Sequence, residues 1–231
     1  MLRRAVLLLV AGAFLGAATG CSGGSSEEPS AGSSTSPGLA PPTSGRTVPC
    51  AYATAGPGSK PVEPPPSRAP AQGEVTVTLS TSAGEVPITL ERDRTPCAVN
   101  SFVSLAQQGF FDDTPCHRLT TQKTFFLQCG DPWGSGFGGP GYTFRDELSG
   151  KESYPAGTVA MANNGPDSNG SQFYLVYEDS PLPADYDVIG HMDRTGIETV
   201  IKVASTGTDN VLGAGDGHPT TPVTIDSVTV S

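Results

Sequence analysis

The sequence predicts an all-β-dominated domain, a closed eight-stranded antiparallel β-barrel capped by two α-helices. Eight short runs alternate apolar and polar residues or are rich in β-branched and aromatic residues, as strands are. Two other segments have apolar residues at helical spacing, and they lie far apart in the chain. The connections are mostly short, which suits antiparallel pairing, and closure would leave no exposed edge strand.

The predicted strands begin with a hairpin. Residues 74–80 (EVTVTLS) and 85–91 (EVPITLE) alternate apolar and polar side chains, and the TSAG between them is typical of a tight turn. The six remaining strands are expected at 116–120, 124–130, 157–162, 171–177, 186–192 and 221–231.

The two predicted helices differ from the strands in period. The first is expected over 95–109, where Val99 and Phe102 share one helical face, a Thr-Pro pair suits the start and Gly109 follows the end. The second is expected over 196–205. Because they are far apart in sequence, the two helices are expected to cover the two open ends of the barrel.

The N-terminus has the pattern of a secretory signal peptide over residues 1–20. Two arginines precede the apolar run AVLLLVAGAFLGAA, which is too short to span a bilayer comfortably. Cys21 then follows a Thr-Gly pair, which resembles a bacterial lipobox, although Ala18 stands where Leu is usual. The resemblance implies acylation of Cys21, palmitate included, and anchoring at the extracytoplasmic face of the cell membrane. The alternative is an ordinary secreted protein with a leftover cysteine.

A tether is expected to follow the anchor, over residues 21–72. This part is rich in Ser, Gly and Pro and has too little apolar surface to offset the entropy of ordering. The stretch TVPCAYA at 47–53 is more apolar than the rest and is the part most suited to dock on the domain. The barrel domain itself is expected over 73–231.

Four cysteines remain after the anchor. An even number in an exported protein suggests two disulfides, with three possible connectivities. A zinc site is the less favoured alternative, because no CxxC pair is present. Strand parity puts two of the four on opposite faces of neighbouring strands, so the pairing stays open. The cysteines are Cys50, Cys97, Cys116 and Cys129.

Composition excludes several functions. The formal net charge of −10 argues against a nucleic-acid partner, which would require a basic face. The GSGFGG at 134–139 has the spacing of a dinucleotide fingerprint, but no helix follows it, so its glycines are interpreted as turns beside a groove. The three histidines are interpreted as structural or surface residues. No hydrolase motif is found, and neither a metal nor a cofactor is expected.

One pair of residues suggests a site. If 116–120 and 124–130 form a hairpin, Arg118 and Gln128 lie on neighbouring strands beside Phe125 and Phe126. Such a group combines an apolar floor with a fixed fork of N–H donors. The alternative is an exposed barrel arginine above core phenylalanines.

At this point the sequence resembles a family, the cyclophilin peptidyl-prolyl cis–trans isomerases. The motifs HRL, FFLQCGDPWGSGFGGPGYTF and AMANNGPDSNGSQFYL carry the resemblance, which runs from about residue 75 to 231. It implies the barrel fold, rotamase activity without a cofactor, and Pro-containing segments of exported proteins as substrates. We expect a monomer that contacts the membrane only through its lipid anchor.

The resemblance also implies the site residues. Arg118 matches the catalytic arginine. The substrate-binding residues are then Phe125, Phe126, Gln128, Gly136, Ala162, Asn163, Asn164, Gln172, Tyr174, Leu182 and Tyr186.

This chain departs from the common family pattern at several of these positions. Phe126 stands where Met is usual, Asn164 where Ala is usual and Tyr174 where Phe is usual. Pro181 replaces the Trp that contacts cyclosporin A, and Tyr186 replaces a His, so the resemblance does not extend to a high cyclosporin affinity. These changes keep open a second hypothesis, a non-catalytic module that binds Pro-containing segments. A purely structural lipoprotein is disfavoured, because the arginine and the groove amides are kept together.

Overall fold

The computed structural model describes residues 45–231. The predicted signal peptide (1–20) and the predicted lipidation site Cys21 lie outside these residues. In the described part, neither helix is both long and apolar enough to cross a bilayer.

The described residues form fourteen strands and two helices. The elements are β1 (Thr47–Pro49), β2 (Ala53–Thr54), β3 (Arg68–Pro70), β4 (Glu74–Thr81), β5 (Gly84–Glu91), α1 (Pro96–Gln107), β6 (Thr114–Cys116), β7 (Arg118–Gln122), β8 (Thr124–Cys129), β9 (Tyr142–Thr143), β10 (Thr158–Met161), β11 (Phe173–Val176), β12 (Val188–Met192), α2 (Arg194–Ala204), β13 (Asp216–Gly217) and β14 (Val223–Val230).

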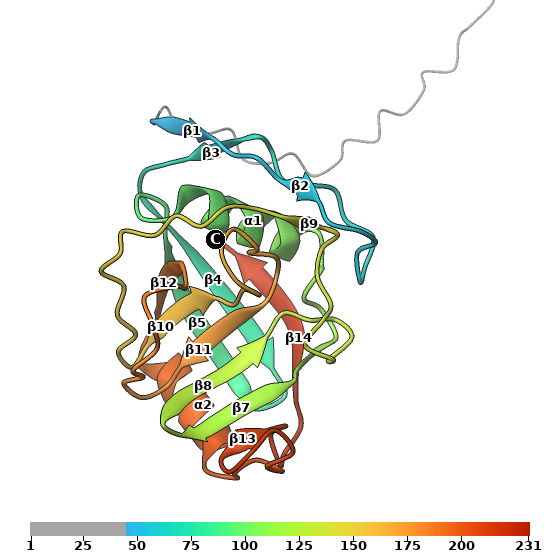
Figure 1. Ribbon diagram of the computed structural model, residues 1–231, viewed down its shortest axis with the longest axis vertical. Coiled ribbons are helices and arrows are strands. Elements are labelled where there is room, and N and C mark those ends of the chain that lie inside the picture. The colour runs from blue at the N-terminus through green and yellow to red at the C-terminus, as the bar shows by residue number, and fades with distance from the viewer. Residues whose placement is uncertain (1–44) are drawn as a thin grey trace, which may run out of the picture. The chain divides into compact units, whose positions relative to one another are not determined.

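Ten strands form one curled antiparallel sheet, in the order β13-β7-β8-β11-β10-β12-β5-β4-β14-β6 (Figure 1). The mostly-β class is confirmed, but the predicted closed eight-stranded barrel is wrong. The expected strand 116–120 is interrupted at His117, so that β6 pairs with β14 while β7 pairs with β8. β13 then adds a further short strand on the outer edge of β7. The sheet is therefore open between its terminal strands.

Both predicted helices are present. Pro96 occupies the first turn of α1, and Gly109 follows its end with a φ of +68°, a conformation that suits glycine. The N–H groups in the first turn of α1 have no partner within the helix. The Glu147 carboxylate satisfies two of them, because it accepts from Cys97 and Ala98. At the start of α2, the side chain of Asp193 accepts from its own first turn. The two helices lie near opposite ends of the curled sheet (Figure 1).

The sheet buries two separate apolar clusters, one on each face. The inner cluster contains most of the large side chains, including Phe102, Phe111 and Phe173. The smaller outer cluster follows the alternate residues of β8, β10, β11 and β12, because successive side chains of a strand point to opposite faces. Its buried members are Phe126, Tyr154, Ala160, Ala162, Tyr174, Val176 and Val188.

All four cysteines in the described part form disulfides, Cys50–Cys97 and Cys116–Cys129. The second pair joins the two residues that strand parity had placed on opposite faces. The alternation of side chains between the two faces is interrupted there, because His117 lies between two separate strands, β6 and β7. Cys116 therefore reaches the inner cluster together with Cys129. The cysteines serve as covalent links and not as ligands of the alternative zinc site.

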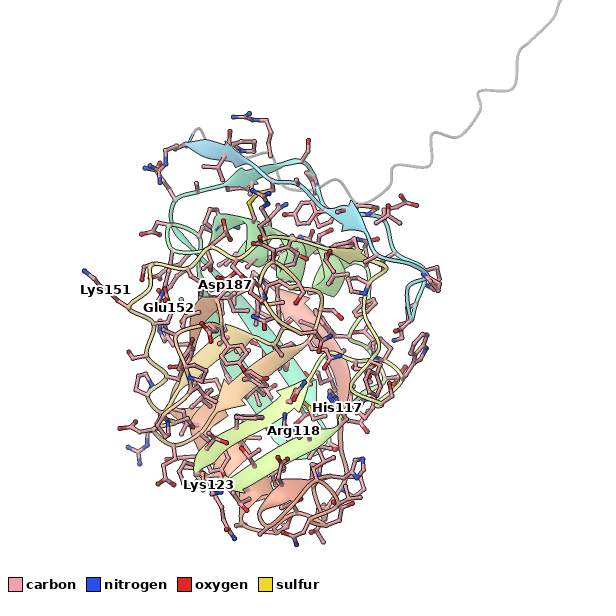
Figure 2. All side chains as sticks on the ribbon, viewed as in Figure 1. His117, Arg118, Lys123, Lys151, Glu152 and Asp187 are labelled. Carbon is pink, nitrogen blue, oxygen red and sulfur yellow. A yellow bond between two sulfur atoms is a disulfide. The ribbon has the colours of Figure 1, made fainter. Side chains whose placement is uncertain are left out.

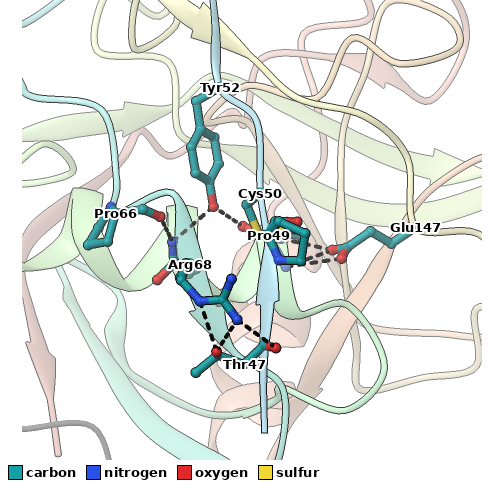
Figure 3. The surroundings of a disulfide bond; sticks show 10 residues. Thr47, Pro49, Cys50, Tyr52, Pro66, Arg68 and Glu147 are labelled. Carbon is teal, nitrogen blue, oxygen red and sulfur yellow. Dashed lines mark hydrogen bonds between the residues drawn. A yellow bond between two sulfur atoms is a disulfide. The ribbon is translucent and has the colours of Figure 1, made fainter.

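Residues 47–70, here called the strap, had been predicted as part of a tether, but they pack on the domain. β1 pairs with β3, and β2 pairs with β9. Cys50 is bonded to Cys97 in α1, and Tyr52 donates its hydroxyl hydrogen to the Cys97 carbonyl at 2.9 Å (Figure 3). The tyrosine ring also packs edge-on against Tyr142 and Phe144. The apolar stretch 47–53, the part expected to be most suited to dock, is thus held by a covalent link and by aromatic packing.

Candidate functional site

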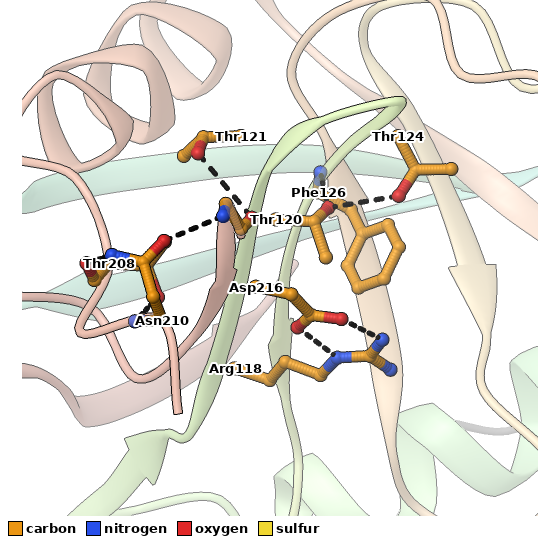
Figure 4. Close-up of polar contacts among 9 residues, drawn as sticks. Arg118, Thr120, Thr121, Thr124, Phe126, Thr208, Asn210 and Asp216 are labelled. Carbon is orange, nitrogen blue, oxygen red and sulfur yellow. Dashed lines mark hydrogen bonds and ion pairs between the residues drawn. The ribbon is translucent and has the colours of Figure 1, made fainter. Parts of the chain in front are cut away.

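Arg118 stands at the start of β7, directly opposite Gln128 of β8. Its side chain is about one-third exposed. The guanidinium carbon lies 5.3 Å from the centre of the Phe126 ring. Nε and Nη2 each donate to a carboxylate oxygen of Asp216 at 2.8 Å, and this hydrogen bonding raises the pKa of Arg118 (Figure 4). Nη1 makes no hydrogen bond within residues 45–231, so one edge of the fork is available to a ligand.

Beside Arg118 lies an apolar floor made by Phe126, Tyr174, Leu182 and Tyr186. The rings of Phe126 and Tyr174 are 4.3 Å apart, and those of Tyr174 and Tyr186 meet edge to face at 5.3 Å. Burial raises the pKa of Tyr174, so this residue stays neutral. The four residues come from β8, β11 and the segment before β12, and the structure brings them together as the sequence had predicted.

Phe125 does not join this floor. It is adjacent to Phe126 in β8, so its side chain points to the opposite face of the sheet. There it packs against the inner cluster, with its ring 6.0 Å from that of Tyr177. The geometry therefore separates Phe125 from the other predicted site residues.

Two glutamines connect the floor to the Gly-rich loop, residues 131–141. Gln128 donates through Nε2 to Gln172 Oε1 at 2.7 Å. Gln172 in turn donates to the carbonyls of Gly136 and Gly138, both at 2.9 Å. The Oε1 atom of Gln128 is buried and has no partner within the described residues.

Asp131 holds the start of the Gly-rich loop. Its carboxylate is buried and accepts from the backbone of Trp133, Ser135 and Gly136 at 2.7 to 2.8 Å. Burial acts to raise its pKa, but these hydrogen bonds outweigh burial and hold the pKa below its usual value. The negative charge at Asp131 thus shapes the loop that carries Gly136.

The opposite side of the site is the turn after β10. Ala162 is buried and donates its N–H to the Gln172 carbonyl at 2.9 Å. Asn163 uses its side chain within the turn, donating to the Asp185 carbonyl and accepting from Gly165. Asn164 is exposed, and its backbone N–H donates to Ser168. These contacts stabilise the turn and leave its backbone beside the floor.

A side groove of about 230 Å³ lies between this turn and the Gly-rich loop. Gln128 and Gln172 border it on one side, and Ala55 and Pro57 of the strap border it on another. The only tryptophan of the chain, Trp133, also lines it and is 59% exposed. No charged side chain is among the lining residues, so the groove suits uncharged groups.

The histidines stand outside this chemistry. Burial lowers the pKa of His117, whose two ring nitrogens have no partner in the described part of the chain. His191 and His218 are exposed and bond Glu91 and Asp209. Within residues 45–231, no three His, Cys, Asp or Glu side chains are grouped so as to hold a metal ion.

Sequence reasoning missed three residues of the site. Asp216 orients Arg118, Asp131 shapes the Gly-rich loop, and Tyr154 bonds both the N–H and the carbonyl of Tyr186. For Asp131 the signal was an acidic residue at the head of a Gly-rich loop, where carboxylates often accept backbone N–H groups. For Asp216 and Tyr154 no local signal exists, because their partners lie 98 and 32 residues away.

Comparison with known proteins places this arrangement among related ones. Residues 76–230 match the family model described as cyclophilin type peptidyl-prolyl cis-trans isomerase/CLD. A solved structure of a cyclophilin type isomerase from Cryptosporidium parvum superposes with a TM-score of 0.61 at 27% identity, covering 69% of this chain and 98% of that one. A second structure of the same protein, in the presence of the dipeptide Ala-Pro, gives a TM-score of 0.60 at 27% identity, covering 68% of this chain and 98% of that one.

Two curated relatives are similar over most of the domain. The chain is 49% identical over 169 residues to a probable peptidyl-prolyl cis-trans isomerase B of Mycobacterium tuberculosis, covering 67% of this chain and 54% of the relative. It is 43% identical over 203 residues to a probable peptidyl-prolyl cis-trans isomerase B of Mycobacterium leprae, covering 81% and 68%. The chain thus spans about half the length of the first of these relatives.

Proposed function

Because the chain belongs to the cyclophilin-type peptidyl-prolyl cis–trans isomerase family, we propose that its domain catalyses rotation about X–Pro bonds in exported polypeptides. The observation that carries this proposal is the position of Arg118, a fixed donor at the edge of an apolar floor that fits a proline ring. The Cryptosporidium relative studied with Ala-Pro supports a proline-containing ligand.

The reaction needs few functional groups. Rotation about an X–Pro bond has a barrier of about 20 kcal/mol, because it disrupts amide resonance. No covalent bond to the protein forms and no net proton transfer occurs. An enzyme therefore need only bind the twisted amide better than either planar form.

Each part of the site has a role in this scheme. The ring of Phe126 and its apolar neighbours hold the proline, while the acyl side of the bond rotates. In the twisted state the prolyl nitrogen becomes pyramidal and gains a lone pair, to which Arg118 donates. Gln128 and Ala162 line the side groove, where they border the path of the extended chain. A preorganised donor that bonds the twisted amide best lowers the barrier.

The test is an isomerisation assay on a short Ala-Pro-containing peptide with the purified domain, 45–231. Turnover that saturates with peptide and is lost in Arg118→Ala supports the proposal. Absence of turnover by the unsubstituted protein contradicts it.

A second function is favoured by one observation. Asp216 occupies two nitrogens of Arg118, which leaves only part of the fork for a substrate. A non-catalytic module would bind the same peptides through the apolar floor and the side groove. Saturable peptide binding without any acceleration of isomerisation would identify that module.

We further propose that the protein is exported and anchored through Cys21 as a monomer at the extracytoplasmic face of the cell membrane. The sequence pattern at 1–20 supports this, and so do two disulfides, which persist in oxidising compartments. Mass spectrometry of the mature N-terminus tests it. An acylated Cys21 and a membrane fraction that is lost in Cys21→Ser are expected, whereas an unmodified N-terminus in both proteins contradicts the anchor.

A further inference from the structure

The strap runs beside the Gly-rich loop and pairs with it through the backbone. Thr54 of β2 lies opposite Tyr142, and Ala55 donates its N–H to the Gly141 carbonyl at 2.9 Å. Further along, Ser59 donates to the Gly139 carbonyl at 2.8 Å and accepts the Gly139 N–H through Oγ. The two segments thus form one backbone-bonded unit at the edge of the side groove.

Two glycines permit this close approach. A Cβ atom on Gly58 would lie 2.9 Å from the Pro140 carbonyl oxygen. A Cβ atom on Gly141 would lie 2.9 Å from the Gly58 nitrogen, and Gly141 also has a φ of +84°. Contacts this short require that both residues lack side chains. The strap is therefore fitted to the Gly-rich loop and does not merely lie over it.

The strap is fixed to α1 near its start and near its end. Cys50 is bonded to Cys97, and Asn100 donates to the Tyr52 hydroxyl and to the Pro66 carbonyl, both at 2.9 Å (Figure 3). Lys60 donates to the Asp112 carbonyl just after the helix. The position of the strap is thus determined by a covalent link and by bonds on both sides of the groove segment.

We propose that the strap is a specificity-determining wall of the substrate groove. Ala55 and Pro57, both exposed, face the side groove together with Gln172 and select a small or medium, uncharged side chain of the bound peptide. The inference rests on the proposed function, because it assigns a selection step to the same site. Gln172 bonds both the Gly-rich loop and Gln128, so a side chain in the groove lies next to the proline site.

The test enlarges the wall and measures peptide selection. Ala55→Phe narrows the groove, while Ala51→Phe adds the same ring at an exposed strap position that does not line it. Two peptide series vary the residue two positions before or two positions after proline, from Gly to Leu, Phe and Lys. For one series, Ala55→Phe should lower the ratio of kcat/KM for Phe over Gly peptides about tenfold, and Ala51→Phe should leave it unchanged.

Binding gives a readout that does not depend on catalysis. Trp133 is the single tryptophan and lines the groove, so its fluorescence reports peptide occupancy in every variant. An unchanged Phe-to-Gly ratio in both series, by kcat/KM and by Kd, overturns the inference. A protein that binds selectively but never isomerises overturns only the proposed activity.

The disulfide provides a second arm. Cys50→Ser with Cys97→Ser removes the covalent link between the strap and α1 but keeps Cys116–Cys129. The unsubstituted protein should prefer uncharged over Lys peptides, and this preference should fall at least threefold in the double variant. Circular dichroism confirms that the variant is folded. Retention of the full preference in a folded variant contradicts a role of the Cys50–Cys97 link in the selection.

Discussion

Arg118 and Asp216 form a two-bond ion pair, in which Nε and Nη2 of the arginine each lie 2.8 Å from a different carboxylate oxygen (Figure 4). Both residues lie on neighbouring strands, β7 and β13, although they are 98 residues apart in sequence. A paired fork fixes the plane of the guanidinium as well as its position. Asp216 is therefore a positioning residue for the proposed chemistry, in which Arg118 is the group proposed to touch the substrate.

Asp216→Asn should lower kcat about tenfold and leave KM almost unchanged, because an amide cannot accept two bonds from the fork and the donor loses its alignment. Steady-state kinetics on the Ala-Pro peptide measure this. Glu198→Gln is the matched control, since it removes the carboxylate of an exposed Arg194 pair on α2. An equal loss in both variants, or a change in KM alone, speaks against a positioning role.

Arg118→Ala should lower kcat/KM about 100-fold, the loss that follows removal of one preorganised donor. Arg118→Lys should recover little, because an ammonium group cannot reproduce the planar fork. The free energy of unfolding should change by about 1 kcal/mol or less, since the pair with Asp216 is partly exposed. Kinetics and urea unfolding of the same samples check both statements. Full activity in the Ala variant refutes the assignment.

Asp187 predicts a pH dependence of stability. Burial raises the pKa of Asp187, which is labelled in Figure 2, to about 7. The nearby Glu147 and Asp146 charges act in the same direction. The unfolded value is about 3.9, so between these values the folded state holds a proton that the unfolded state releases. The stability that the folded state gains by holding this proton is fully present below about pH 4 and is lost as the pH rises to about 7.

Asp187→Asn keeps an acceptor for the Glu147 N–H and removes the titration. The free energy of unfolding of this variant, minus that of the unsubstituted protein, should rise by about 2 to 4 kcal/mol as the pH increases from 4.5 to 8. Urea unfolding at both pH values measures the gain. The exposed neighbour variant Asp185→Asn should show no such trend, and parallel pH curves for Asp187→Asn would exclude the predicted linkage.

The two disulfides should differ in their contribution to stability. They close loops of 47 and 13 residues. In the chain-entropy account, Cys50–Cys97 then contributes about 4 kcal/mol and Cys116–Cys129 about 3 kcal/mol. Urea unfolding of the two Ser–Ser double variants, each without reductant, gives the difference. A smaller loss of unfolding free energy without Cys50–Cys97 than without Cys116–Cys129 would contradict this account. It would mean that the strap stays ordered in the unfolded chain, or that closing the 47-residue loop contributes little to stability.

Local pattern was sufficient wherever the deciding contacts are close in sequence. The hairpin of β4 and β5, both helices and the pairing of Arg118 with Gln128 follow from periods of 2 and 3.6 and from short turns. Of the apolar floor, strand alternation placed Phe126 beside Gln128, whereas Tyr174, Leu182 and Tyr186 were expected from the motif resemblance. Motif resemblance then identified the family, which the matched family model confirms.

The rest depended on contacts between distant residues. His117 ends one ladder and Arg118 begins another, which opens the barrel and lets Cys116 meet Cys129. No local period contains that break. Phe125 was likewise expected beside Phe126 from the motif resemblance, whereas the pleat of β8 separates the two side chains.

The sequence by itself determined most of the strands, both helices and the place of Arg118 opposite Gln128, because each depends on residues within one or two elements. Only the tertiary structure decided the strap and the partner of Arg118. The strap looked like a tether because its composition is poor in apolar residues, yet a disulfide and backbone bonds to the Gly-rich loop hold it. Asp216 reaches Arg118 across 98 residues, and such a contact is set by how the sheet curls and not by any local pattern.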